Sequence, residues 1–163
     1  MMKSDRFSVG LLDQHHLYVP SEIVEVFPKE KRNRFKVKFQ HQDKSLEVYA
    51  ALRKDKNTGD YRMMFSKGNQ AKLGLFQNDY FEMQLIEDTS KYGVEMPEEL
   101  DEVFKTDVEA FRIFESFTAG KKRSIIYTII RIKNSQKRID KALLLCENLK
   151  KGITDQRTLF KPQ

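Results

Sequence analysis

The chain has 163 residues, a net charge of +6 at pH 7 and one cysteine, Cys146. With 39% hydrophobic and 33% charged residues it has a globular rather than a disordered composition, and it is long enough to bury a core without disulfides or metals. One thiol cannot form an internal disulfide, and no leader or apolar run of about 18 residues occurs. We therefore expect a cytoplasmic monomer or weak homodimer without a membrane-spanning segment.

Residues 1–90 are expected to form β-structure with two short helices. The run Arg34–Phe39 alternates strictly between charged and apolar residues, which is typical of a half-buried strand. The turn "HQDK" then returns the chain as a partner strand, and "KNTGD" is a further turn in which Gly59 can take positive φ. The strands are predicted at residues 7–12, 17–19, 34–39, 45–52, 61–65 and 79–86, and the helices at 22–27 and 70–73.

A faint internal repeat suggests how these strands are arranged. "LYVPSEIVEVFP" leading into "RFKVKF" and "MMFSKGNQAKLGL" leading into "DYFEMQL" both predict strand, short helix, turn and strand. Two such units related by a pseudo-twofold would leave no free strand edge if they closed into a barrel. The predicted fold class is therefore α+β, with a closed N-terminal β-barrel followed by a helical segment.

The second half of the chain is predicted to be helical. Pro97 suits a first helical position, and Thr106 with Glu109 has the spacing of a capping box. Two longer helices are expected at 121–133 and 136–151, and Gly152 ends the second. The expected organisation is a barrel domain at 1–90, a helical segment at 91–152 and a tail at 153–163.

Charge is distributed unevenly along the sequence. Residues 1–90 carry 15 basic and 13 acidic residues (+2), residues 91–117 carry 3 and 8 (−5), and residues 118–163 carry 12 and 3 (+9). The cations Lys121, Lys122 and Arg123 would stand at the start of a helix, where they oppose the helix dipole. Two interpretations stay open: the acidic block 95–109 pairs with the basic block 121–141, or these cations bind a polyanion.

A second basic feature lies on the alternating strand. If Phe35, Val37 and Phe39 point inward, then the basic residues between them point outward at about 6.6 to 6.8 Å intervals, close to the spacing of phosphates along one nucleic-acid strand. A symmetric hairpin would place Tyr49 opposite Lys36 and Glu47 opposite Lys38. The alternative is an ordinary solvated face. The candidate nucleic-acid-binding residues are Arg32, Arg34, Lys36, Lys38, Tyr49, Lys121, Lys122 and Arg123.

Two stretches carry a resemblance to a known family. "DTSKYGVEMPEELDEVF" and "FTAGKKRSIIYTIIRIKNSQKRIDKAL" resemble the YdeI/OmpD-associated family. The resemblance implies that the N-terminal half is similar to an AbrB-like double-split barrel made from one chain. The turn "LGLFQND" resembles the AbrB-like turn before the last strand, with Asn78 in place of a glycine. The family name implies a link to bacteriocin protection rather than a defined chemistry.

No catalytic or metal-binding pattern is present in the sequence. His15 and His16 are adjacent and His41 falls in a turn, so convergent ligands are not predicted, and we expect no metal and no cofactor. Cys146 falls on an apolar helical stripe with Ile139, Ala142, Leu143 and Leu149, which favours burial over reactivity. We therefore expect a non-enzymatic binding or regulatory module with a nucleic-acid or protein partner. The alternative is a small-molecule-binding protein or enzyme with a barrel-end pocket near His15, His16 and Tyr18.

Overall fold

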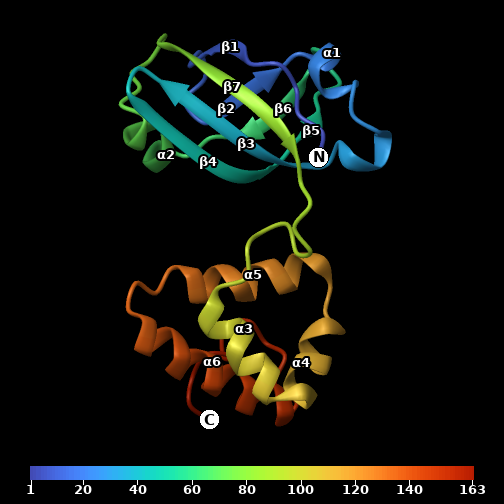
Figure 1. Ribbon diagram of the computed structural model, residues 1–163, viewed down its shortest axis with the longest axis vertical. Helices are drawn as coiled ribbons and strands as arrows, with labels where there is room; N and C mark the ends of the chain where they lie inside the picture. Colours follow the sequence, from blue (N-terminus) through green and yellow to red (C-terminus); the bar gives the residue numbers. More distant parts are fainter. The chain divides into compact units, whose positions relative to one another are not determined.

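The computed structural model describes residues 1–163, which divide into two compact units, Met1–Thr89 and Ser90–Gln163. All strands lie in the first unit, here named the sheet unit, and helices α3 to α6 form the second, the helical unit (Figure 1). None of the helices combines the length and apolar character that crossing a membrane requires.

The sheet unit contains two antiparallel sheets. One has four strands in the order β1-β7-β3-β4 and the other has three in the order β2-β6-β5. The strands are β1 (Phe7–Gly10), β2 (His16–Val19), β3 (Arg34–His41), β4 (Lys44–Ala51), β5 (Arg53–Lys54), β6 (Tyr61–Met64) and β7 (Tyr80–Glu87). The short helices are α1 (Ser21–Val24), α2 (Lys67–Lys72) and the 3-10 turn η1 (Lys29–Lys31).

The predicted closed barrel is wrong, because both sheets are open. Equivalent strands of the internal repeat do pair antiparallel, β2 with β6 and β3 with β7, but no ladder joins the two sheets. The β5 strand has two residues and pairs only with β6. Between β1 and β2 the chain turns on Asp13, whose carboxylate accepts the backbone N–H groups of His15 and His16. Neither the β5–β6 pairing nor the turn at Asp13 joins the hydrogen-bond ladder of one sheet to that of the other. The AbrB-like barrel is therefore not supported.

The apolar faces of the two sheets share one core. Phe39 stacks on Phe65 at 5.0 Å between ring centroids, and Phe65 stacks on Phe81 at 5.7 Å. Leu17 and Met63 of the three-stranded sheet belong to the same buried cluster. Burial of such rings against both sheets holds the unit together even though the sheets do not close.

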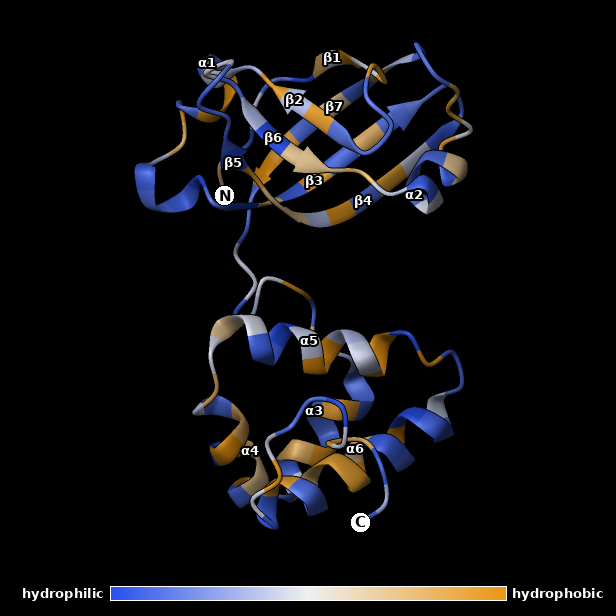
Figure 2. Cartoon of the chain, turned by 180° about the vertical axis from the view of Figure 1, so that it is seen from behind, coloured by the Kyte–Doolittle hydropathy of each residue, from blue (hydrophilic) through white to orange (hydrophobic).

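The helical unit consists of α3 (Glu98–Thr106), α4 (Val108–Glu115), α5 (Ala119–Ile130) and α6 (Ser135–Lys150). Helix α3 packs against α6, and Figure 2 shows hydrophobic residues, in orange, along α6. The buried face of α5 consists of Ile125, Ile126 and Ile129, which are fully buried. Leu143, which the sequence prediction placed on the apolar stripe of α6, is 53% exposed, so the prediction is wrong for this residue.

Helix ends account for the remaining differences from the sequence predictions. Thr106 is not the N-cap of α4: its hydroxyl donates to Val103 O, and the Asp107 carboxylate accepts the Ala110 N–H instead. Gly152 ends α6 with a φ of +84°, as predicted. The segment beyond it is packed, because Asn148 Nδ2 donates to Leu159 O and Lys161 O, both at 2.9 Å.

Candidate functional site

The outer face of the four-stranded sheet carries the predicted basic strand. Phe35, Val37 and Phe39 are fully buried, which confirms the alternation of β3. Side chains of a strand alternate between its two faces, so Lys36 and Lys38 project from the face opposite the core.

The β3–β4 hairpin has the predicted register. Lys36 pairs with Tyr49 and Lys38 pairs with Glu47 across the two strands. Lys36 Nζ lies 3.3 Å from Glu47 Oε2 and 5.8 Å from the centroid of the Tyr49 ring. The carboxylate thus offsets part of the positive charge of this face, and the aromatic ring lies beside the ammonium group.

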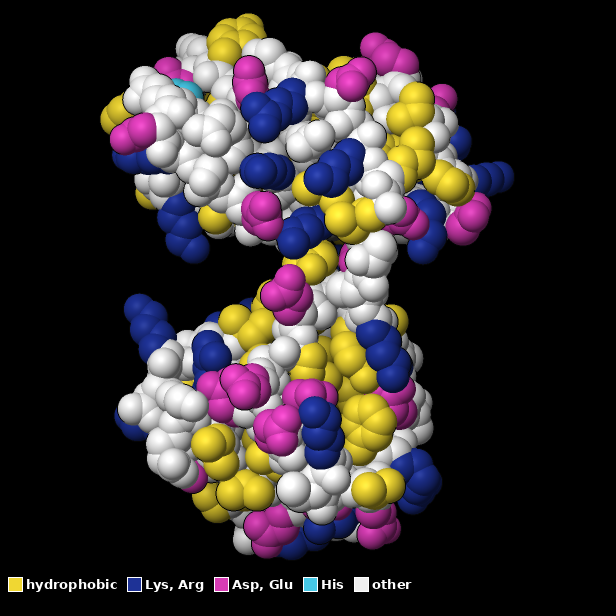
Figure 3. Space-filling model, in the orientation of Figure 1, with side chains coloured by type: hydrophobic (Ala, Val, Ile, Leu, Met, Phe, Trp, Pro, Cys, Tyr) yellow, Lys and Arg dark blue, Asp and Glu magenta, His cyan; other side chains and the backbone are white.

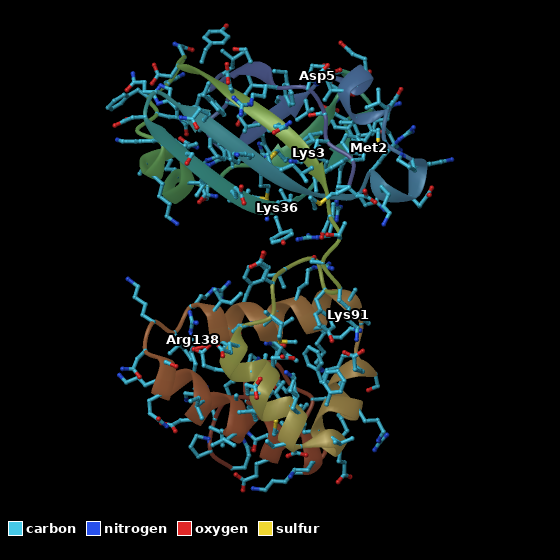
Figure 4. The ribbon with its side chains drawn as sticks, in the orientation of Figure 1. Met2, Lys3, Asp5, Lys36, Lys91 and Arg138 are labelled. Atoms are coloured by element: carbon cyan, nitrogen blue, oxygen red, sulfur yellow. The ribbon has the colours of Figure 1, made fainter.

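The N-terminal segment adds two cations that the sequence prediction missed. Lys3 forms a β-bridge with Ile86, and Ile86 pairs on its other side with Lys36, so these residues form one row across the sheet. Figure 4 shows Lys3 and Lys36 over the same face. Arg6 lines a shallow hollow together with Lys38. An isolated bridge leaves no alternating pattern, so no sequence signal pointed to these two residues.

We name the four cations Lys3, Arg6, Lys36 and Lys38 the sheet-face cluster. Lysine and arginine side chains, dark blue in Figure 3, gather on the side of the sheet unit turned to the viewer. Lys3, Arg6 and Lys38 form no ion pair with a carboxylate. Glu82 lines the Arg6–Lys38 hollow, so the face is predominantly but not purely basic.

Two other predicted residues of the sheet unit have structural contacts. Arg32 donates from Nε to Phe27 O and from Nη2 to Glu25 O, each at 2.9 Å, which fixes the chain after α1. Arg34 Nε lies 4.0 Å from Asp88 Oδ2, and its side chain is 24% exposed. Neither guanidinium extends the cluster as an exposed cation.

The predicted cations of α5 belong to the helical unit, and two of them contact the protein itself. Lys121 Nζ donates to Thr154 O and lies 4.1 Å from the Phe117 ring centroid. Lys122 Nζ lies 3.5 Å from Glu115 O and 5.6 Å from the Tyr92 ring centroid. These contacts compensate part of the unfavourable charge at the start of α5. No such contact is found for Arg123.

Tyr92 lies at the centre of a further charged group in the helical unit. Its hydroxyl donates to Glu115, and Lys91 Nζ lies 3.5 Å from the other oxygen of that carboxylate. Lys91 is labelled in Figure 4. Burial and the hydrogen bond to Glu115 raise the pKa of Tyr92 well above its usual range, so the phenol stays neutral.

The acidic and basic blocks pair only in part. Arg138 Nη1 lies 3.4 Å from Glu99 Oε1, which joins 95–109 to 121–141. Asp107 of the acidic block pairs instead with Lys150, which lies beyond the basic block, at 2.8 Å, and the Lys150 ammonium holds the pKa of Asp107 below its ordinary value. Arg138 also donates to Ile130 O and Ile132 O at the end of α5. Arg138 therefore ties α3, α5 and α6 together.

The three residues of the predicted barrel-end pocket separate in the structure. His16 and Tyr18 line a hollow of about 220 Å³ between β1 and β2, whereas His15 does not. His16 Nδ1 lies 3.4 Å from Asp13 Oδ1. The complete lining of this hollow, named the seam hollow, is Ser8, Val9, Gly10, Leu12, Asp13, His16, Tyr18 and Pro20.

A third hollow and the cysteine lie in the helical unit. The hollow measures about 430 Å³ and lies between α3 and α6, and its lining includes Glu98, Glu99 and Glu102. Cys146 is 2% exposed, and burial raises the pKa of its thiol to about 12. No group of three or more His, Cys, Asp or Glu side chains is arranged to hold a metal ion.

The architecture defines an α+β protein in which an open-sheet unit precedes a four-helix unit. Residues 93–152 match the model of the family described as "Bacteriocin-protection, YdeI or OmpD-Associated". The sequence resemblance to that family is thereby confirmed for this segment, which includes all of α3 to α6. No curated protein and no solved structure matches the chain.

Proposed function

We propose that this protein is a non-enzymatic binding module whose sheet unit binds nucleic acid through the sheet-face cluster. The observation that carries the proposal is the gathering of four cations from separate segments on one face, three of them without an ion pair. Unpaired cations cost folding stability by mutual repulsion, and a polyanion removes that repulsion while it binds.

The size of the cluster sets the strength of binding. If all four cations contact phosphates, the slope of log affinity against log salt is about −2.8 for a single strand. Affinity would then fall about 50-fold between about 50 and 200 mM salt. Glu47 and Glu82 lie on the same face and repel phosphates, which lowers the affinity further.

The test is fluorescence anisotropy of labelled single-stranded DNA, duplex DNA and RNA at low and near-physiological salt. The informative variant is the triple substitution Lys3→Glu, Arg6→Glu and Lys38→Glu, since none of the three has an ion pair to lose. The matched control is Lys56→Glu, Lys67→Glu and Lys72→Glu, which changes the net charge equally at exposed residues of the same unit outside the face.

We expect the face variant to abolish binding and the control to retain most of it. Equal loss in both variants would show that net charge, not the sheet-face cluster, attracts the nucleic acid. Absence of binding by the native protein at low salt would overturn the proposed function.

The family description supports a proposal for the physiological setting. The words "bacteriocin-protection" describe the family that matches the helical unit. We place the module accordingly in a regulatory response to antimicrobial peptides or a related stress. A deletion strain would show increased sensitivity to such peptides, and complementation with the face variant would fail to restore tolerance.

A further inference from the structure

The seam hollow is formed where the two open sheets fail to join. It lies between β1, an edge strand of one sheet, and β2, an edge strand of the other. Its volume of about 220 Å³ lies below the range of about 300–1,000 Å³ that is usual for drug-sized ligands. The hollow therefore has room for one planar ring rather than for a large ligand.

Aromatic and apolar side chains surround this space. Tyr18 lines the hollow and is 39% exposed, and Leu12 is 67% exposed. Gly10 leaves room for the neighbouring ring of Tyr80, because a Cβ at Gly10 would lie 3.0 Å from it. An exposed tyrosine beside a ring-sized space offers a stacking surface to a flat ligand.

The polar groups of the hollow are oriented by Asp13. Its carboxylate accepts the backbone N–H groups of His15 and His16, and the hydrogen bond from His15 lowers the pKa of Asp13. An ionised Asp13 can only accept, so the Nδ1 atom of His16, at 3.4 Å, carries the proton between them. In the imidazole form that carries its one proton on Nδ1, the Nε2 atom is an acceptor for an N–H group of a ligand.

The seam hollow adjoins the sheet-face cluster along one chain segment. Arg6 lines the hollow that it shares with Lys38, and Ser8 lines the seam hollow. Ser8 pairs with Glu82, which in turn lines the Arg6–Lys38 hollow. Residues two apart on a strand are separated by about 6.6 to 6.8 Å, which is within the reach of one nucleotide.

We infer that the seam hollow accepts one unpaired base of a single-stranded nucleic acid whose phosphates contact the sheet-face cluster. The inference rests on the proposed function and narrows its substrate class. The base stacks on Tyr18, and an N–H group of the base donates to His16. A duplex keeps its bases paired and stacked inside the helix, so it contacts the face without filling the hollow.

The test compares two labelled single strands with the same number of phosphates. One is a short thymine oligonucleotide and the other is its abasic counterpart. We expect the native protein to bind the base-carrying strand more tightly. Tyr18→Ala should weaken that binding about 5- to 150-fold, the range for loss of one base–aromatic stack, and leave the abasic strand unaffected.

Three further variants complete the experiment. Tyr18→Phe should retain binding because it keeps the ring, His16→Ala should weaken it, and His15→Ala is the neutral neighbour that does not line the hollow. Equal binding of both strands by the native protein, or unchanged binding by Tyr18→Ala, would overturn the inference alone. If neither strand binds at low salt, this inference is overturned, and if duplex DNA and RNA also fail to bind, the proposed function is overturned with it.

Discussion

The two units differ in the contacts of their most prominent cations. In the helical unit Arg138 donates to two carbonyl groups and pairs with Glu99, Lys150 pairs with Asp107, and Lys121 reaches Thr154 O. In the sheet unit Lys3, Arg6 and Lys38 lie on one face without an ion pair. The sequence surplus of +9 lies in 118–163, yet the exposed basic face lies in the segment that carries only +2. Local charge counts therefore do not locate a binding face, because they ignore which cations already have protein partners.

The largest expected effect is the unfolding of the helical unit when a charge is placed in its buried core. Ile129→Asp places a carboxyl group at a fully buried position, at a cost of about 5 kcal/mol or more. That cost is comparable to the whole stability of a small domain. The helical circular dichroism signal should fall sharply, while Ser124→Asp, at an exposed residue of the same helix, should retain it. A stable Ile129→Asp product with native helicity would contradict the buried face of α5.

The second largest expected effect is a loss of stability in the helical unit when the contacts of Arg138 are removed. Arg138→Ala removes three contacts at once and should lower the free energy of unfolding by about 2–3 kcal/mol in urea denaturation. Arg138→Lys should not restore it, because one ammonium group cannot replace the forked guanidinium. The control Lys137→Ala removes an exposed side chain of the same turn and should change stability by less than about 0.5 kcal/mol.

A smaller loss of stability is expected when Asp107 is replaced, and two substitutions separate its N-cap role from its ion pair with Lys150. Asp107→Ala removes the N-cap of α4 and the Lys150 ion pair, for about 1–2 kcal/mol. Asp107→Asn keeps an acceptor for the Ala110 N–H and should lose less. Because the folded-state pKa of Asp107 is lowered, its stabilisation is present above about pH 5 and is lost as the pH falls below about 4. In denaturation curves at pH 7 and pH 3, the native protein should therefore approach Asp107→Asn at the lower pH, while Asp107→Ala stays less stable at both.

The smallest expected change in stability is that of the sheet-face cluster variant. The triple variant Lys3→Glu, Arg6→Glu and Lys38→Glu should change the melting temperature by no more than a few degrees, since exposed substitutions usually alter stability by less than about 0.5 kcal/mol each. A drop in melting temperature like that of Arg138→Ala would show that these cations stabilise the fold. The contrast between the two units would then disappear.

Sequence periodicity predicted the parts of the fold that depend on neighbouring residues. The alternation at Arg34–Phe39 gave the buried side of β3, and the turn "HQDK" gave the hairpin register that places Tyr49 opposite Lys36. Asn78 takes a φ of +70°, as the resemblance to a glycine-containing turn implied. Each of these features is determined within a few residues of chain.

Barrel closure and the composition of the site depend on contacts between distant segments. The pattern could not reveal that β5 pairs over only two residues, nor that Asp13 turns the chain between β1 and β2. Arg32 looked equivalent to Lys38 in sequence, but its hydrogen bonds to Phe27 O and Glu25 O appear only in three dimensions. Lys3 reaches the face through a bridge to a residue more than eighty positions away.

The single buried thiol, Cys146, allows local opening of the helical unit to be measured by chemical labelling. Cys146 lies on the buried side of α6 with 2% exposure, and its pKa is raised to about 12. A thiol reagent at neutral pH therefore modifies it only when the surrounding helices separate. No other cysteine competes in the chain. The labelling rate, followed by mass spectrometry, therefore measures how often this half of the molecule opens, and a ligand bound to the sheets would change that rate only if the two halves are energetically coupled.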